Sequence, residues 1–188
     1  MKSDTISTRL RRWVSLWSSV AGVLQALAGS GTAQGLEEMK AVVRSRFPDV
    51  PQLQPAELAA WLADTNRVKP ILIDVRTEPE YRISHLPGAI RIAPAAHGKE
   101  LEPYVSQSRP LVVYCSVGYR SSELATRLRK AGQTNVLNLE GSIFAWANEN
   151  RPMVSEGDKP AQVVHPYNQT FGKLLNKDRW PKAWDPPR

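Results

Sequence analysis

The feature that most constrains the fold of this 188-residue chain is a series of short apolar runs with helical patterns between them. Residues 71–75 read Ile-Leu-Ile-Asp-Val, a run that is rich in β-branched residues and too short for a helix, which is typical of a strand buried on both faces. Further strands are expected at 89–92, 111–114 and 136–139, and helices at 78–84, 98–107, 121–131 and 142–149. Strands that alternate with helices predict an α/β fold with a mostly parallel open sheet and helices on both faces.

The same patterns divide the chain into a body and flanking segments. Leu36, Met39 and Val43 recur at helical spacing and predict an amphipathic helix that ends before Pro48. We expect the polar, proline-rich C-terminal extension to pack on the body with its tryptophans over apolar surface; exposed aromatic residues would instead favour a lid or a partner-docking element. The expected regions are a signal or membrane-associated segment at 1–33, a helix and link at 34–50, the body at 51–150 and the extension at 151–188.

The formal net charge of +7 is concentrated at the two ends of the chain. Residues 1–33 and 151–188 each carry a net +3, whereas residues 34–150 carry only +1. A protein that binds nucleic acid usually has a basic face on its folded core, so the sequence argues against DNA or RNA as a partner.

The N-terminal segment has the layout of a secretory signal. Residues 13–36 contain no charged residue and follow three arginines, and the small residues before Ala33 fit a cleavage site after it. We therefore expect a periplasmic or exported protein. An amphipathic helix on a membrane surface and an ordinary helix of a cytoplasmic protein stay open alternatives, because serines interrupt the run and its apolar residues also recur at helical spacing.

Cys115 is the only cysteine of the chain, which excludes an intramolecular disulfide and a cysteine-based metal cluster. It is therefore either a buried apolar filler or a reactive thiol. It follows the predicted strand 111–114, and residues 116–120 lead from it toward the next helix. At such a strand end, loop N–H groups, the helix N-terminus and Arg120 would stabilise a thiolate and hold an anion. This context favours the reactive thiol, although no histidine lies near it in the sequence.

Four short motifs lie in order along residues 51–150. They are Asp74-Val75-Arg76 with Glu80-Tyr81, His85-Leu86-Pro87-Gly88-Ala89-Ile90, Cys115-Ser116-Val117-Gly118-Tyr119-Arg120-Ser121, and Leu139-Glu140-Gly141-Ser142 before Ala145-Trp146. In these motifs the chain resembles the rhodanese-like sulfurtransferases. The last motif of that family commonly carries two glycines, and Ser142 stands in place of the second.

The resemblance implies a single rhodanese-like domain that moves sulfur in two steps. The Cys115 thiolate would take a sulfane sulfur from a small anionic donor such as thiosulfate, and the persulfide would pass it to cyanide, a small thiol or a protein thiol. The resemblance implies no metal and no cofactor beyond this covalent persulfide. The expected substrate-binding residues are Ser116, Val117, Gly118, Tyr119, Arg120 and Arg76, and the expected supporting residues are Asp74, His85 and Ser121.

The charged residues around the expected site, in the first and third motifs and between them, have the following expected roles. Arg76 would either orient the substrate or form a structural ion pair beneath the loop. Glu78 and Glu80 are expected at a solvated helix start, not in a pair of catalytic carboxylates. We expect Arg120 at the rim of the loop, where its removal would leave the fold intact.

Two other functions share this pattern. Phosphatases and arsenate reductases with this fold place five residues between the cysteine and the arginine, whereas four lie between Cys115 and Arg120, and the shorter loop favours sulfur over phosphate. Rhodanese-like domains that only bind or regulate often lose the cysteine, which is retained here.

Overall fold

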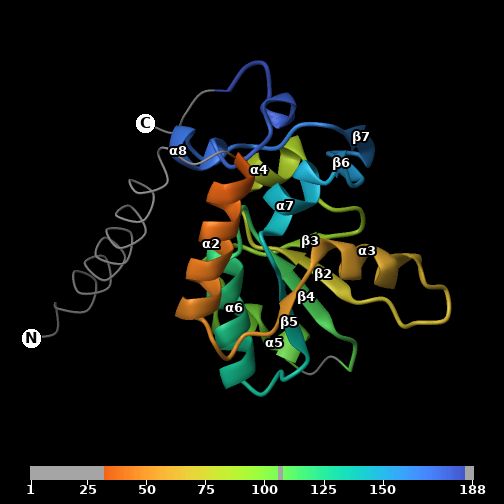
Figure 1. Cartoon of the computed structure of the whole chain (residues 1–188). Helices are drawn as coiled ribbons and strands as arrows, with labels where there is room; N and C mark the ends of the chain where they lie inside the picture. The colour runs from red at the N-terminus through yellow and green to blue at the C-terminus, as the bar shows by residue number, and fades with distance from the viewer. Residues whose placement is uncertain (1–31, 106–107, 185–188) are drawn as a thin grey trace, which may run out of the picture.

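The computed structural model describes residues 32–105 and 108–184 and contains a five-stranded parallel sheet (Figure 1). The strand order is β1-β5-β4-β2-β3, and every neighbouring pair runs parallel. The strands are β1 (Gln52–Leu53), β2 (Ile71–Asp74), β3 (Ile90–Arg91), β4 (Leu111–Tyr114) and β5 (Val136–Leu139). The predicted α/β fold with a mostly parallel sheet is thereby confirmed.

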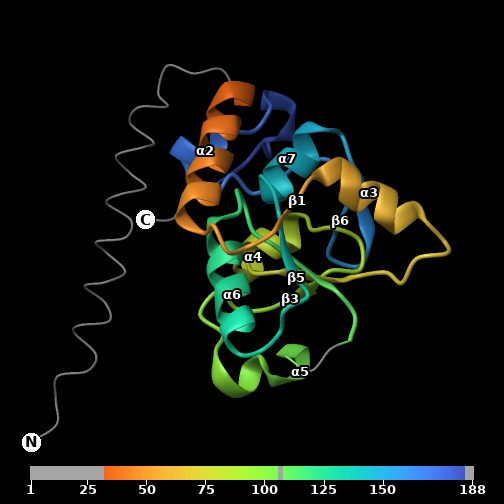
Figure 2. The same ribbon diagram turned by 60° about the horizontal axis from the view of Figure 1, so that its bottom comes forward.

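Helices cover both faces of this sheet (Figure 2). They are α2 (Thr32–Arg46), α3 (Pro55–Ala63), α4 (Glu78–Ile83), α5 (Glu102–Val105), α6 (Tyr119–Lys130), α7 (Ser142–Asn148) and α8 (Gln169–Gly172), with the short 3-10 helices η2 (Gly98–Glu100) and η3 (Lys177–Arg179). One core lies between the sheet and α2, α3 and α7, and the other lies between the sheet and α6.

The central strand β4 is buried on both faces, as its continuous apolar sequence predicts. Leu111 and Val113 belong to the core shared with α6, whereas Val112 and Tyr114 belong to the core shared with α2, α3 and α7. Cys115 follows on the α6 side. Because all five strands are parallel, the residues that follow β2, β4 and β5 lie together at the carboxyl ends of the strands, where α/β proteins bind their ligands.

The short elements differ from the sequence predictions. Gln52 and Leu53, for which no strand is expected from the sequence, form the edge strand β1, which pairs with β5. The helix expected over 98–107 is divided into η2 and α5. Pro103 is the second residue of α5, where a proline is tolerated, but it cannot donate to the Lys99 carbonyl and its ring would clash there, which disfavours one continuous helix from residue 98. The antiparallel hairpin of β6 (Met153–Ser155) and β7 (Lys159–Ala161) was not expected, since its residues carry no alternating apolar pattern.

The C-terminal extension lies against the body beside α2, α4 and α7 (Figure 1). Phe171, Leu174 and Leu175 are buried in the core that α2, α3 and α7 share. The amide group of Asn148 donates to the Leu174 carbonyl at 2.9 Å and accepts the N–H of Asn176 at 2.9 Å. The extension is therefore joined to α7 by both apolar packing and hydrogen bonds.

The N-terminal prediction falls mainly outside the described residues. The structure describes the chain from Thr32, where α2 begins, so that helix includes the last two residues of the predicted segment 1–33. Export of the protein stays a prediction. Among the helices in the described part of the chain, none has the length and apolar character needed to cross a membrane.

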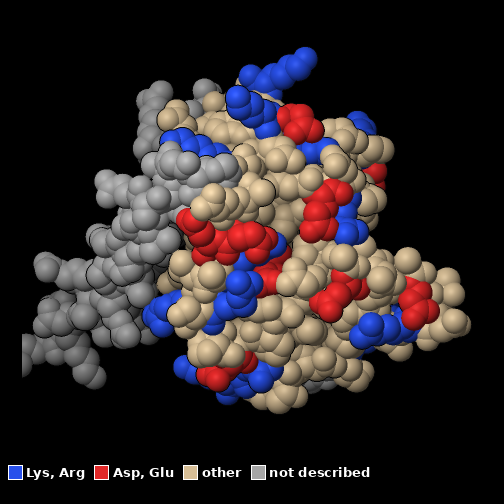
Figure 3. All heavy atoms as spheres, in the orientation of Figure 1, with Lys and Arg blue, Asp and Glu red and all other residues tan. Residues whose placement is uncertain are grey.

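On the face shown in Figure 3, acidic and basic side chains lie side by side.

Candidate active site

Cys115 stands at the carboxyl end of β4, and the start of α7 holds its backbone in place. The N–H of Cys115 donates to Ser142 Oγ at 3.1 Å, and the N–H of Ile143 donates to the Cys115 carbonyl at 3.2 Å. Ser142 also donates to the Leu139 carbonyl at 3.2 Å. Its φ of 52° lies in the left-handed region, which suits the glycine common at this position in the resembled family. This positioning role of Ser142 was not expected from the sequence.

The loop after Cys115 turns back toward the sulfur. The N–H of Gly118 donates to Cys115 Sγ at 3.2 Å, and Gly118 is the N-cap of α6 with a φ of 106°. A β-carbon there would lie 3.1 Å from Asn138 Nδ2, so both the backbone and the space favour glycine. The first N–H groups of α6 have no partner within the helix, so they can bind an anion beside the same sulfur.

The side chains of the loop point away from this centre. Val117 is buried in the core beside α2, and the ring of Tyr119 packs edge-on against Phe47 with 5.1 Å between centroids. Ser116 donates its hydroxyl to Glu80 Oε1 at 3.1 Å. The predicted contacts of Val117 and Tyr119 with substrate would therefore come from backbone N–H groups.

Glu80 and Arg120 form a buried ion pair directly beside the loop. The two Nη atoms of Arg120 donate to the two carboxylate oxygens of Glu80 at 2.9 and 2.7 Å, and the side chains are 13% and 2% exposed. Glu80 also accepts the N–H of Thr77 at 2.9 Å. The expectation that Glu80 lies at a solvated helix start is therefore wrong, whereas Glu78 is exposed. Arg120 is likewise largely buried and not at an open rim, because its pairing with Glu80 draws it inward.

A second buried ion pair lies beneath the site. Arg76 is fully buried, and its Nε and Nη2 donate to the Asp74 carboxylate at 3.0 and 2.7 Å. Its Nη2 also donates to the Ser84 carbonyl. Of the two roles considered for Arg76, this geometry supports the structural ion pair, with Asp74 as its partner.

His85 and Ser121 each join neighbouring elements. The His85 ring stacks on Tyr81 with 3.7 Å between centroids, and its Nδ1 lies 2.9 Å from the Tyr81 carbonyl oxygen. Ser121 donates its hydroxyl to Asn138 Oδ1 at 2.6 Å, which connects α6 to β5. Both arrangements fit the supporting roles predicted for these residues. Within residues 32–105 and 108–184, no group of three His, Cys, Asp or Glu side chains is placed to hold a metal ion.

The surroundings of Cys115 favour its thiolate. Burial by itself raises the pKa of the thiol, but the charge of Arg120 and hydrogen bonds from Ser121 and Gly118 outweigh it, so the pKa lies below its ordinary value. A larger thiolate fraction at neutral pH makes this sulfur a better nucleophile.

Replacing Arg120 by alanine is therefore expected to raise the pKa of Cys115, because the guanidinium is lost while the Glu80 carboxylate stays nearby. The rate of alkylation by iodoacetamide, measured against pH, reports this pKa. Arg120→Lys keeps a charge and is expected to raise the pKa less, and Arg127→Ala, two turns further along α6, serves as the control. An unchanged profile in Arg120→Ala would mean that hydrogen bonds alone stabilise the thiolate.

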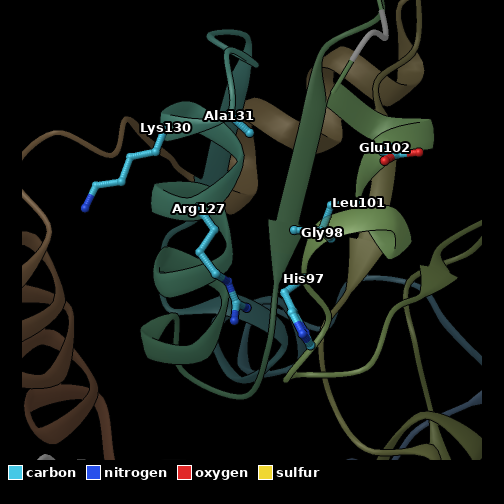
Figure 4. Close-up of a pocket in the computed structure, with 7 residues that line it drawn as sticks. All are labelled: His97, Gly98, Leu101, Glu102, Arg127, Lys130 and Ala131. Carbon is cyan, nitrogen blue, oxygen red and sulfur yellow. The ribbon is translucent and has the colours of Figure 1, made fainter.

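A separate groove lies beside the last turns of α6 (Figure 4). Its volume is about 600 Å³, and its lining consists of His97, Gly98, Leu101, Glu102, Arg127, Lys130 and Ala131. Cys115 precedes the first turn of this 12-residue helix, which spans about 18 Å, so the groove is not part of the Cys115 site.

A comparison with family models decides the family. The model of the rhodanese-like domain matches residues 54–149, about half of the chain. The chain belongs to the rhodanese-like domain family. The matched region contains β2 to β5, both ion pairs and the Cys115 loop.

Relatives of this rhodanese-like domain carry sulfurtransferase names. The probable adenylyltransferase/sulfurtransferase MoeZ of Mycobacterium tuberculosis is 39% identical over 101 residues, which cover 53% of this chain and 25% of that protein. A sulfurtransferase of Allochromatium vinosum is 32% identical over 106 residues, which cover 56% of this chain and 96% of that protein. The chain thus spans about a quarter of MoeZ and nearly all of the smaller relative.

A solved structure agrees with the family. The rhodanese-like domain of the Alr3790 protein from Anabaena superimposes with a TM-score of 0.51 at 26% identity, covering 59% of this chain and 85% of that one. The part of the present chain that follows residue 149 lies outside the family match.

Proposed function

We propose that the protein is a sulfurtransferase that carries a sulfane sulfur on Cys115. The observation that carries the proposal is the hydrogen bond from the Gly118 N–H to Cys115 Sγ, made at the N-terminus of α6 and next to Arg120. It supports the proposal because a thiol with a lowered pKa lies where backbone N–H groups can hold a negatively charged sulfur. The sulfurtransferase names of the relatives from Mycobacterium tuberculosis and Allochromatium vinosum support the same chemistry.

The first step loads the cysteine. The Cys115 thiolate attacks the outer sulfur of thiosulfate, a new S–S bond forms, and the old S–S bond breaks with its electron pair leaving on sulfite. The outer sulfur of the resulting persulfide carries the negative charge when deprotonated. The N–H groups of Gly118 and of the first turn of α6 would stabilise that charge.

The second step unloads it. The carbon of cyanide or the sulfur of an acceptor thiolate attacks the outer sulfur of the persulfide, and the S–S bond breaks with its electron pair returning to Cys115. The products are thiocyanate or an acceptor persulfide, together with the original thiolate. The transferred sulfane sulfur is itself the oxidant of the acceptor, so the proposed cycle balances without an external oxidant, reductant or redox cofactor.

Phosphate chemistry is the alternative that this site supports less well. Arginine commonly binds a phosphate ester through two parallel N–H donors, which must be directed at the phosphate oxygens. In this site each Nη atom of Arg120 already donates to Glu80, and Nη2 also donates to Ser116 Oγ at 3.0 Å, so the guanidinium is directed at protein groups and less available to a phosphate. The four-residue spacing between Cys115 and Arg120 also leaves a smaller site than a phosphatase loop.

A direct assay separates these functions from each other and from a binding module. Purified protein is expected to form thiocyanate from thiosulfate and cyanide, and to do so faster than it hydrolyses an aryl phosphate at the same concentration. Faster phosphate hydrolysis would support the phosphatase alternative. Neither activity, with the thiol shown to be free by titration, would support a domain that only binds.

A further inference from the structure

Tyr167 reaches the active-site loop from a part of the chain that lies beyond the family match. Its ring centroid lies 4.9 Å from the guanidinium carbon of Arg120, which is close enough for a cation–π contact. The guanidinium of Arg120 also donates hydrogen bonds to Glu80 and Ser116, so it cannot move away from the ring without breaking them. The C-terminal extension therefore supplies an aromatic wall next to the Cys115 loop.

The position of this ring is determined by its surroundings. Tyr167 has a φ of 65°, which costs a non-glycine residue about 1 kcal/mol. Its N–H donates to His165 Nδ1 at 3.0 Å, and its ring packs edge-on against Phe171 with 5.5 Å between centroids. Asn168 Oδ1 accepts the N–H of Phe171 at 2.9 Å, and Phe171 is buried in the core. These contacts hold the strained conformation and with it the ring.

The phenol lies within electrostatic reach of the reactive sulfur. Burial raises the pKa of Tyr167, Arg120 lowers it, and the negative charges of Glu80 and Cys115 raise it further. The phenol therefore remains a neutral O–H group at neutral pH. Cys115 itself is only 1% exposed, although its sulfur has to meet both a donor and an acceptor.

We propose that Tyr167 is a specificity-determining residue whose ring narrows the entrance to Cys115, so that small sulfur donors and acceptors enter in preference to bulky thiols. The inference rests on the proposed function, because it assigns the substrate size that the same cysteine accepts. Its support is the ring contact with Arg120, the fixed conformation of Tyr167 and the burial of Cys115.

Alkylation of Cys115 in the full chain tests whether the Tyr167 ring limits access to the sulfur, and it does not require catalytic turnover. Two rates are measured for each variant, one with iodoacetamide and one with the much larger fluorescein maleimide. In Tyr167→Ala the ratio of the bulky to the small rate is expected to rise by about tenfold. Tyr167→Gly removes the ring and also relieves the strain at positive φ, so it should give the same ratio with better folding. Tyr167→Phe keeps the ring and should keep the wild-type ratio.

Sulfur transfer then gives the substrate readout. With thiosulfate as donor, the kcat/KM for glutathione relative to that for cyanide is expected to rise in Tyr167→Gly and to stay unchanged in Tyr167→Phe. Wild-type ratios in the alanine and glycine variants, with native circular dichroism, would overturn the inference, and so would equal ratios in the phenylalanine and alanine variants. If the wild-type protein transferred no sulfur, the proposed function would be overturned instead. The alkylation ratios of the wild type and the Tyr167 variants would still test whether the ring limits access to Cys115.

Discussion

Replacing Cys115 by serine is expected to abolish sulfur transfer from thiosulfate to cyanide. A serine hydroxyl is not ionised at neutral pH, and it forms no persulfide, so both steps of the proposed cycle lose their nucleophile. The rate of thiocyanate formation, measured from the coloured complex of thiocyanate with iron, should fall to the rate measured without protein.

The same variant should remain folded, because serine is nearly the same size as cysteine and the neighbouring Ser142 and Gly118 groups can still hydrogen-bond to it. Its urea midpoint, measured beside that of the wild type, controls for unfolding. Wild-type turnover in a folded Cys115→Ser protein would show that another group carries the sulfur.

Replacing Glu80 by glutamine is expected to lower the free energy of unfolding by about 3 kcal/mol, because it leaves Arg120 as a charge without its buried partner. Urea denaturation at pH 7 measures this loss. Glu78→Gln makes the same chemical change on the same helix at an exposed side chain that pairs with Arg82, and it should cost less than about 0.5 kcal/mol. Equal losses in the two variants would mean that the buried pair is not a major source of stability.

The contribution of Glu80 should also depend on pH. Burial opposes ionisation of this carboxyl, but the hydrogen bonds and charge of Arg120 outweigh it and lower its pKa to about 2 from 4.5. Because the folded pKa is the lower one, the stabilisation is fully present above pH 4.5 and is lost as the pH falls toward 2. The difference in stability between wild type and Glu80→Gln should therefore shrink over that window, whereas a constant difference would contradict the account.

The parts of the fold that could be predicted are those with a strong local pattern. The apolar runs of β2 and β4 are too short for a helix and favour a buried strand, and the position of Cys115 after β4 follows from them. β1 has only two residues and is a strand only because β5 lies beside it. The β6–β7 hairpin likewise has a tertiary partner, since Val154 pairs with His85.

The candidate site shows the same division. Gly118 and Arg120 could be placed at the loop from spacing alone, but the burial of Glu80 depends on Arg120, which lies 40 residues away. One local signal was available, since Thr77 and Glu80 have the spacing of a capping box and form it in the structure. Tyr167 had no such signal, because the extension has no periodic pattern and its place is set by tertiary contacts.

The central claim is that Cys115 carries the sulfur, and intact-mass analysis after treatment with thiosulfate tests it most directly. The account predicts a gain of about 32 Da, one sulfur atom, on the wild-type protein, with peptide mapping that assigns it to Cys115. The gain should disappear after incubation with cyanide and be absent from Cys115→Ser. An unchanged mass in wild-type protein with a free thiol, or the same gain in Cys115→Ser, would contradict the account.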